Sequence, residues 1–292
     1  VVKYFKLLKR SYAHLKPVNS VQFSPDGTKI LASAAHEKIR IFGTRLQSLR
    51  GHSDIVNSAQ YSSDGKMIVS CSNDQTIRVW NANSRKEIKK LEGHTGHVTS
   101  ARFSPDGTII VSSSKDGTIR LWDVKSGEEI KRFQHPAWVN DIQFSSNGQF
   151  FLSSSLDKTV DVWDVRLGAK ISEVCRHRNP VTRAQYSPDG KAIITCSTDH
   201  IIRVWDAMSQ TTTKQFEGHS ANINGVKFFP DGQTMVSCSD DTTVRLWNMQ
   251  LGTEIQVLKG HSSKVTGVDI SPDGSTIVSC SGRKTIRLWG FL

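Results

Sequence analysis

The chain has 292 residues, of which 37% are hydrophobic, and its formal net charge at pH 7 is +11. It contains no run of about 18 apolar residues, so the composition excludes a membrane-spanning helix, and we expect no membrane partner. Lys3, Lys6 and Lys9 interrupt the short apolar stretch at the N-terminus, which excludes a secretory signal peptide. The first residue is Val rather than Met, so we expect a fragment of a longer protein.

One pattern repeats along the chain, and its third copy runs from Gly93 to Asp123. In this copy a His precedes a closing aromatic residue by 28 positions. The same spacing holds in all seven copies: His14 and Phe42, His52 and Trp80, His94 and Trp122, His135 and Trp163, His177 and Trp205, His219 and Trp247, and His261 and Trp289. Seven units of constant length indicate one structural module stacked repeatedly, and a period near 40 residues is typical of propellers and solenoids.

The third unit shows what the module is. A short first strand begins near Val98, and Ser-Pro-Asp-Gly at 104–107 is a turn in which Pro sets φ and Gly supplies a positive φ. Residues 108–114 and 118–122 are a β-branched second strand and an alternating third strand, and residues 129–133 are a weaker fourth strand. Because four short antiparallel strands cannot bury both faces alone, the sequence predicts an all-β fold, a seven-bladed β-propeller.

The two ends of the chain are expected to close this ring. The last unit stops at Leu292, just after its third strand, and Tyr4 to Lys9 can supply the missing fourth strand. Other fourth strands place Ile or Leu six and three residues before the His, where this segment has Leu8 and Ser11, so pairing in a shifted register is the alternative. One repeat array accounts for the length, and we expect a single domain over residues 1–292.

Recurrent dipeptides connect these units with a known family. Gly-His occurs at 51–52, 93–94, 218–219 and 260–261, and Trp is followed by Asp or Asn at 80, 122, 163, 205 and 247. This pattern resembles the WD40 repeat family over nearly the whole chain. The resemblance implies a buried hydrogen-bonded tetrad in each of five units: His52, Ser70, Asp74 and Trp80; His94, Ser112, Asp116 and Trp122; His135, Ser153, Asp157 and Trp163; His177, Thr195, Asp199 and Trp205; and His219, Ser237, Asp241 and Trp247.

Two units depart from the tetrad. The first has Ala32, His36 and Phe42 at three of the positions, and the last has Arg283 in place of Asp. Either other contacts hold this seam, which we favour, or these positions are released for binding. A nearby Ser, His and Asp would otherwise suggest a hydrolase, but fivefold repetition favours a structural clamp. No phosphate loop, nucleophile elbow or carboxylate pair occurs elsewhere, so we predict no catalytic residues and no enzyme activity.

Cysteine placement argues against metal and cofactor sites. Cys71, Cys196, Cys238 and Cys280 each lie nine residues before a Trp, where other units have Ser, so the position requires a small buried side chain. Equivalent positions in different blades are too far apart for a disulfide. Without a Cys-X-X-Cys or Cys-His cluster we expect no metal and no cofactor, and an intracellular location, cytoplasmic or nuclear.

The expected binding face carries the His loops and the Asp turns. From the resemblance, partners are bound by residues that flank the first-strand Val and by the residue before the tetrad Asp. Trp138 is the one tryptophan that does not close a third strand, and we predict an apolar hot spot there, with folding down over the blade as the alternative. The predicted partner-binding residues are Trp138, Asn140, Leu156, Pro180, Ile55, His97, Lys115 and Lys264.

The leading functional prediction is a non-catalytic scaffold or recognition domain for a peptide or protein, monomeric within a larger protein or complex. The net charge supports an alternative, binding of nucleic acid or an acidic partner through basic residues, namely Lys16, Arg50, Lys115, Arg178, Lys259, Lys264, Arg283 and Lys284. Salt dependence discriminates the two. A further alternative is a substrate receptor of a cullin-type ubiquitin ligase, because Trp163-Asp164-Val165-Arg166 resembles the WDxR docking motif.

Overall fold

The computed structural model describes residues 4–12 and 16–291, apart from the side chains of residues 12, 36 and 37. His14, the first repeat's predicted His, lies outside the described residues. Every regular element in the described part is a β-strand, and the strands form seven separate four-stranded antiparallel sheets. The predicted seven-bladed β-propeller is therefore confirmed, including the pairing of the N-terminal strand β1 with the last blade.

The blades are numbered in chain order, and each is described from its innermost strand outward. Blade 1 contains β2 (Val18–Phe23), β3 (Ile30–Ala34), β4 (His36–Phe42) and β5 (Gln47–Arg50). Blade 2 contains β6 (Val56–Tyr61), β7 (Met67–Ser72), β8 (Ile77–Asn81) and β9 (Glu87–Leu91). Blades 3 and 4 contain β10 (Val98–Phe103), β11 (Ile109–Ser114), β12 (Thr118–Asp123), β13 (Glu129–Gln134), β14 (Val139–Phe144), β15 (Phe150–Ser155), β16 (Thr159–Asp164) and β17 (Ala169–Arg176). Blade 5 contains β18 (Val181–Tyr186), β19 (Ala192–Ser197), β20 (Ile202–Asp206) and β21 (Thr212–Phe216). Blades 6 and 7 contain β22 (Ile223–Phe228), β23 (Thr234–Ser239), β24 (Val244–Asn248), β25 (Thr253–Leu258), β26 (Val265–Ile270), β27 (Thr276–Ser281), β28 (Thr285–Gly290) and β1 (Lys6–Tyr12).

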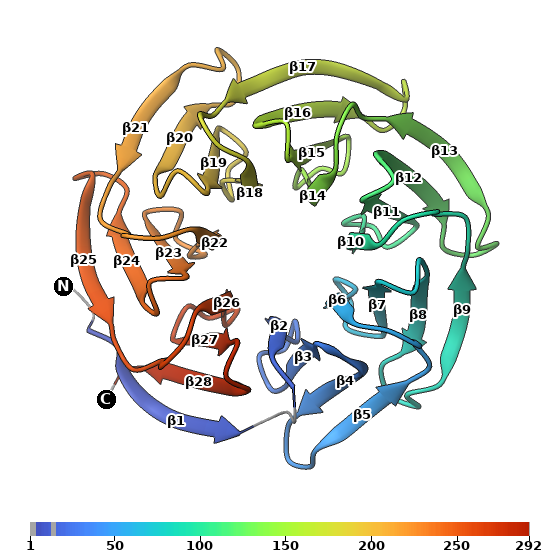
Figure 1. Cartoon of the computed structure of the whole chain (residues 1–292), viewed down its shortest axis with the longest axis horizontal. Coiled ribbons are helices and arrows are strands. Elements are labelled where there is room, and N and C mark those ends of the chain that lie inside the picture. The colour runs from blue at the N-terminus through green and yellow to red at the C-terminus, as the bar shows by residue number, and fades with distance from the viewer. Residues whose placement is uncertain (1–3, 13–15, 292) are drawn as a thin grey trace.

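Figure 1 shows the blades arranged in a ring, with the first strand of each blade innermost and the fourth on the rim. Because the strands of a blade alternate in direction, the chain turns on two faces of the ring. One face carries the loops that lead into the first strands and the turns between second and third strands, and we call it the His face. The opposite face carries the turns between first and second strands and the connections between third and fourth strands.

The core lies between neighbouring blades. In blade 3 the β-branched strand β11 is buried almost throughout, as expected for a strand covered on both sides. One apolar cluster joins Ile77 and Leu91 of blade 2 to Val98 and Trp122 of blade 3. A similar cluster crosses the seam between blades 7 and 1. Each blade therefore depends on its neighbours to bury its faces.

A ring of hydrogen bonds also joins the blades near the axis. The residue after the first-strand Val or Ile donates its side-chain N–H or O–H to the backbone carbonyl of the equivalent Val or Ile in the next blade, at 2.6 to 2.9 Å. The seven donors are Asn19, Asn57, Thr99, Asn140, Thr182, Asn224 and Thr266. The last of them donates to Val18 O, so this ring is continuous across the seam.

The seam uses the same strand register as the other blades. Trp289 pairs with Leu7 and Leu288 with Lys9, with an irregularity between the two pairs, and blade 2 has the same irregularity between Trp80 and Val79. The alternative of a shifted register is therefore wrong. The position of a core Leu in blade 2 is taken by Ser11 here.

Compensating contacts come from the residue just before β1. The Phe5 ring is buried and packs against Phe229 and Phe291, at centroid distances of 5.8 and 4.3 Å. The Gln256 side chain exchanges two hydrogen bonds of 2.9 Å with the backbone of Phe5. These contacts attach the N-terminal segment to blade 6 as well as to blade 7.

Candidate interaction face

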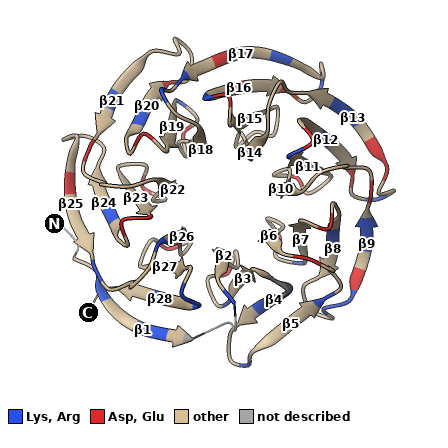
Figure 2. Ribbon diagram, viewed as in Figure 1, with Lys and Arg blue, Asp and Glu red and all other residues tan. Residues whose placement is uncertain are grey.

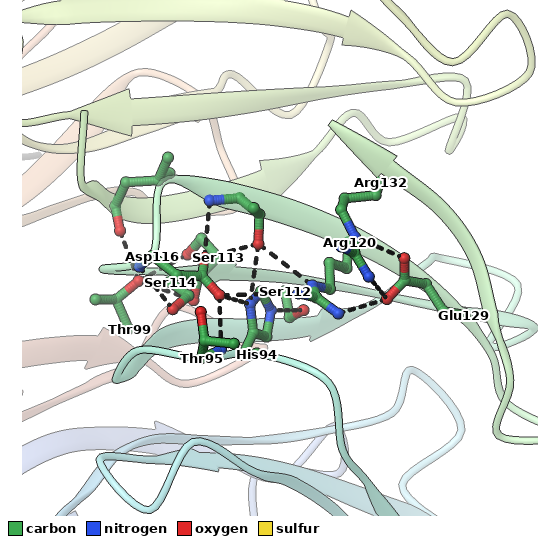
Figure 3. A network of polar contacts seen from close by, with 12 residues as sticks. His94, Thr95, Thr99, Ser112, Ser113, Ser114, Asp116, Arg120, Glu129 and Arg132 are labelled. Carbon is green, nitrogen blue, oxygen red and sulfur yellow. Dashed lines mark hydrogen bonds and ion pairs between the residues drawn. The ribbon is translucent and has the colours of Figure 1, made fainter. Parts of the chain in front are cut away.

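Blade 3 shows how the loops of the His face are held (Figure 3). His94 Nδ1 lies 2.9 Å from Asp116 Oδ2, and His94 Nε2 lies 2.8 Å from Ser112 Oγ. An ionised Asp accepts only, so Nδ1–H donates to the carboxylate and Ser112 O–H donates to Nε2. Trp122 Nε1–H donates to the same Ser oxygen at 2.8 Å. The tetrad therefore ties the incoming loop to the second and third strands.

Burial and hydrogen bonding set the charges in this clamp. Burial lowers the pKa of His94, so the imidazole is neutral at pH 7 despite the nearby carboxylate. Burial alone would raise the pKa of Asp116, but hydrogen bonds from His94 and Thr118 outweigh it, and the pKa is lowered well below its usual range. The clamp is thus a neutral imidazole beside an ionised carboxylate.

Blades 2 and 6 make the same set of contacts, and blade 5 makes it with an added contact of 2.6 Å between Arg203 Nη1 and His177 Nδ1. In blades 2 and 6 the His to Asp distances are 2.8 and 2.6 Å, and in blade 5 the distance is 3.4 Å. The His to hydroxyl and Trp to hydroxyl contacts in these blades are 2.7 to 2.9 Å. The residues that meet are His52, Ser70, Asp74 and Trp80; His177, Thr195, Asp199 and Trp205; and His219, Ser237, Asp241 and Trp247.

Blade 4 differs from this pattern. Trp163 Nε1 donates to Ser153 Oγ at 2.8 Å, but His135 Nε2 makes no hydrogen bond with any described atom. It lies 3.3 Å from Asp161 Oδ2, within ion-pair distance but not aligned as a hydrogen bond. The expected partner Asp157 is 3.8 Å from Nδ1. The expected His–Ser contact is thus replaced by a contact with a carboxylate two residues before the Trp.

The residue two before the Trp forms an ion pair beside several of the clamps, with a partner that varies. In blade 5, Arg203 pairs with the clamp residue Asp199 itself at 2.6 Å. In blade 3, Arg120 Nη1 donates to Glu129 at 2.6 Å, and Arg245 pairs with Glu254 in the same way in blade 6. Blade 4 has the reverse polarity, because Asp161 occupies the Arg position and pairs with Lys170 at 2.7 Å. The sequence shows Asp161 as the exception, but its partner nine residues later follows only from the strand register.

The two blades at the seam lack the complete clamp. In blade 7, Trp289 and His261 both contact Ser279 at 2.8 Å, and His261 Nδ1 faces Thr285 Oγ1 at 3.3 Å in place of a carboxylate. Arg283 stands at the Asp position and is exposed. In blade 1 the third strand ends in Phe42. The other seam contacts described above are present where these clamps are incomplete.

The clamps do not form a hydrolytic centre. Each Ser of the complete clamps is buried and its oxygen already accepts from Trp, so a substrate cannot approach it. In the described part of the chain, no group of three or more His, Cys, Asp or Glu side chains could hold a metal ion. All five cysteines are buried and free, and burial raises the pKa of Cys71 to about 12.

Trp138 lies in the loop that leads into β14, and 48% of its surface is exposed. Its carbonyl accepts from Leu156 N at 2.9 Å, and the Leu156 side chain is 42% exposed. Lys115 of blade 3 places Nζ 4.9 Å from the centre of the indole ring. We call Trp138, Leu156 and Lys115 the Trp138 patch, in which a cation–π contact covers part of the half-exposed ring.

The remaining predicted residues occupy different environments on the His face. Asn140 Nδ2 donates one N–H to the inter-blade ring, which leaves its second N–H and its oxygen for a partner. His97 is partly buried, and its Nδ1 has no hydrogen-bond partner among the described atoms. Ile55 and Pro180 are also partly buried, whereas Lys264 is exposed and lies on blade 7, away from the Trp138 patch.

Arg166 of the Trp-Asp-Val-Arg sequence is exposed between β16 and β17, on the opposite face. Its carbonyl accepts from Lys131 Nζ at 2.7 Å. Within the described residues there is no helix that is long and apolar enough to cross a membrane.

Comparison with known proteins places this ring in a family. No curated protein matches the chain. Residues 17–290 match the family described as the IFT122 first beta-propeller, which covers nearly all of the seven blades. This match agrees with the WD40 resemblance and with the seven four-stranded sheets. The chain therefore belongs to the IFT122 first beta-propeller family.

Proposed function

We propose that this propeller is a non-catalytic recognition domain that binds a peptide or protein segment at the Trp138 patch. The supporting observation is the outward indole, which is half exposed, next to an exposed Leu and beneath a Lys cation. A large aromatic ring held in one position loses little conformational entropy on binding, which is why Trp is enriched at interface hot spots. The four clamps on blades 2, 3, 5 and 6 hold neighbouring loops in place.

The surroundings of the patch indicate the kind of segment. An apolar side chain would pack between Trp138 and Leu156, while Lys115 would attract a carboxylate near it. We therefore expect a segment that presents an aliphatic or aromatic residue beside Asp or Glu. The domain would act as a scaffold, because Trp138, Leu156 and Lys115 would bind the segment without any chemical step.

Peptides selected from a random library on the intact protein provide the test. Trp138→Ala is expected to weaken their binding by about 2 kcal/mol, roughly thirtyfold in Kd. Its free energy of unfolding should change by no more than about 1 kcal/mol, the usual range for a surface substitution. Leu251→Ala is the matched control, because Leu251 is an exposed apolar residue between β24 and β25 on the opposite face. Equal effects of both variants on binding, or a large loss of stability in Trp138→Ala, would refute the proposal.

A further inference from the structure

Blades 6 and 7 are neighbours, yet their loops on the His face carry opposite charge. At equivalent positions, Glu217 of blade 6 corresponds to Lys259 of blade 7, and Asp241 corresponds to Arg283. In the same way Asn222 and Thr242 correspond to Lys264 and Lys284. Neither the loop 259–264 nor the turn 281–285 contains an acidic residue. In Figure 2 the turn before β28 is blue and the equivalent turn before β24 is red.

We call Lys259, Lys264, Arg283 and Lys284 the seam patch. All four side chains are exposed, and none has an ion pair or a side-chain hydrogen bond within the described part of the chain. By contrast, Arg120 and Arg245 of the ring are paired with Glu. The charge of the seam patch is thus not neutralised by the protein itself.

The backbone brings three of these cations into one corner. Gly282 N donates to Lys264 O at 3.1 Å, which joins the incoming loop to the turn. The Lys264 side chain lies over Gly282, with Cγ 3.3 Å from the position that a Cβ there would occupy. Arg283 and Lys284 follow directly, so three cations border one glycine.

The groups beneath the patch do not offset its charge. Among the described residues His261 contacts hydroxyls and no carboxylate, and burial together with Arg287 and Arg10 lowers its pKa to about 3, so the imidazole is neutral at pH 7. Blades 2 to 6 each place a carboxylate at the clamp Asp position, namely Asp74, Asp116, Asp157, Asp199 and Asp241, whereas blade 7 places Arg283 there. The missing clamp and the surface charge are therefore one feature of blade 7, because the same residue causes both.

We propose that the seam patch binds a short acidic peptide segment, at a site separate from the Trp138 patch. The charge complementarity is direct, because exposed Lys and Arg donors with no partner attract carboxylates. The flanking blade limits the size of the ligand: Glu217 and Asp240 lie on the same face of blade 6 and repel a polyanion that extends over it. A few consecutive carboxylates fit the patch, whereas a nucleic acid or a flat anionic membrane also covers the acidic blade.

The neighbouring blade supplies the variant for the test. Lys264→Asn, Arg283→Asp and Lys284→Thr together give blade 7 the residues of blade 6 at these positions. Thr242 has φ +72° and Lys284 has φ +64°, so Thr is compatible with the backbone there. Asp at position 283 restores a carboxylate for His261, so we expect this variant to fold. The control carries Lys86→Asn, Lys125→Asp and Lys191→Thr, exposed positions on the opposite face with the same change in charge.

Binding of a fluorescent hexaglutamate peptide to the full chain is the measurement. We expect the wild type to bind it, the blade 7 variant to bind about tenfold more weakly, and the control to bind within about twofold of the wild type. Thermal unfolding checks that both variants are folded, and binding by the wild type should weaken as salt is added.

Three results would overturn the proposal. They are a wild type that does not bind the peptide, an equal loss in the control, and tighter binding of an oligouridylate or of phosphatidylserine vesicles that the blade 7 variant abolishes. Arg283→Asp alone should also weaken peptide binding while leaving the unfolding temperature unchanged or raised; a normal affinity in this single variant would count against the role of the turn.

Discussion

Blades 3 and 4 follow each other in the chain and have the same pairing of second and third strands, yet the side-chain contacts of their polar clamps differ. In both blades the Trp pairs with the second residue of its neighbouring strand, Ile110 in one and Phe151 in the other. Blade 3 has an Arg to Glu pair at the outer end, and blade 4 has Asp161 and Lys170. The fold thus accepts either polarity at this position, and in blade 5 Arg203 pairs with Asp199 instead.

The reversal nevertheless alters the imidazole. In blade 4, Ala137 N donates to His135 Nδ1 at 3.4 Å, which indicates that the proton is on Nε2, facing Asp161. In blade 3 the proton is on Nδ1 and faces Asp116. The reversed outer pair in blade 4 thus accompanies a different set of contacts at the imidazole.

Breaking the reversed pair should give the largest effect. Asp161 is only 2% exposed, so Asp161→Arg places a buried guanidinium beside Lys170 and should lower the free energy of unfolding by about 3 kcal/mol. Lys170→Glu places a second carboxylate beside Asp161 and should cost less, about 2 kcal/mol, because Lys170 is partly exposed.

The double variant tests whether the two residues act as a unit. Asp161→Arg with Lys170→Glu copies the polarity of blade 3, and we expect it to recover at least half of the loss of the first single variant. Urea unfolding of the four proteins measures this coupling. If the double variant is as unstable as the sum of the single ones, the polarity of blade 4 is fixed by something other than the pair.

Removing the clamp hydroxyl should give the next largest effect, and the loss of unfolding free energy should differ between the two blades. Ser112→Ala deprives both His94 and Trp122 of a buried partner, and we expect a loss of about 2 kcal/mol. Ser153→Ala deprives only Trp163, so the expected loss is about 1 kcal/mol. The difference between the two urea midpoints is the quantity of interest. Equal losses would mean that His135 does use Ser153 in solution.

Acid should weaken the clamps of blades 3, 5 and 6. Burial lowers the pKa of His94, His177 and His219, so the unfolded chain binds more protons than the folded one below about pH 6.5. Stability is then complete above that pH and decreases as the pH falls towards the folded pKa values. The Asp241 carboxylate extends this loss of stability to lower pH. Burial alone would raise its pKa, but hydrogen bonds from Thr243 and His219 lower the pKa to about 2.

Urea midpoints measured between pH 7 and pH 4 check the sign. His94→Gln should flatten the pH dependence, because glutamine cannot take up the proton. A midpoint that rises on acidification would contradict the assignment of neutral imidazoles to these blades.

Most of the fold was predictable because it is local and repeated. The constant 28-residue spacing, the Ser-Pro-Asp-Gly turns and the alternating third strands require only neighbouring residues. The closure of the ring by the N-terminal segment was also predictable, because the last unit lacks a fourth strand. Its register was not, because Ser11 occupies a position that other blades fill with Leu, Phe or Cys, and the compensation comes from Phe5 and Gln256.

The polar contacts were less predictable, because they join residues about one repeat apart or depend on a strand irregularity. The sequence predicts Asn140 as a partner-binding residue, yet its side-chain amide donates to the carbonyl of Val181, 41 residues later. Lys170 reads as a solvated surface charge until the irregular pairing of β16 and β17 brings it to Asp161. The contact of Trp138 with Lys115 joins it to the preceding blade, which no local pattern specifies.

The smallest expected difference in stability concerns the outer rim. There blade 3 donates a hydrogen bond to the next blade, whereas blade 4 accepts one from the next blade. Lys131 of blade 3 donates to Arg166 O of blade 4 at 2.7 Å, whereas Ser172 of blade 4 accepts from Gln210 of blade 5 at 2.5 Å. Both contacts are at least partly open to water, so each group can be hydrated when its partner is removed. Lys131→Met and Gln210→Ala should therefore each lower the free energy of unfolding by about 0.5 kcal/mol. Urea unfolding at low and high salt resolves the two, since only the Lys contact carries charge and should weaken with salt. Losses above about 2 kcal/mol would instead mean that rim contacts, and not the apolar clusters between blades, hold this part of the ring together.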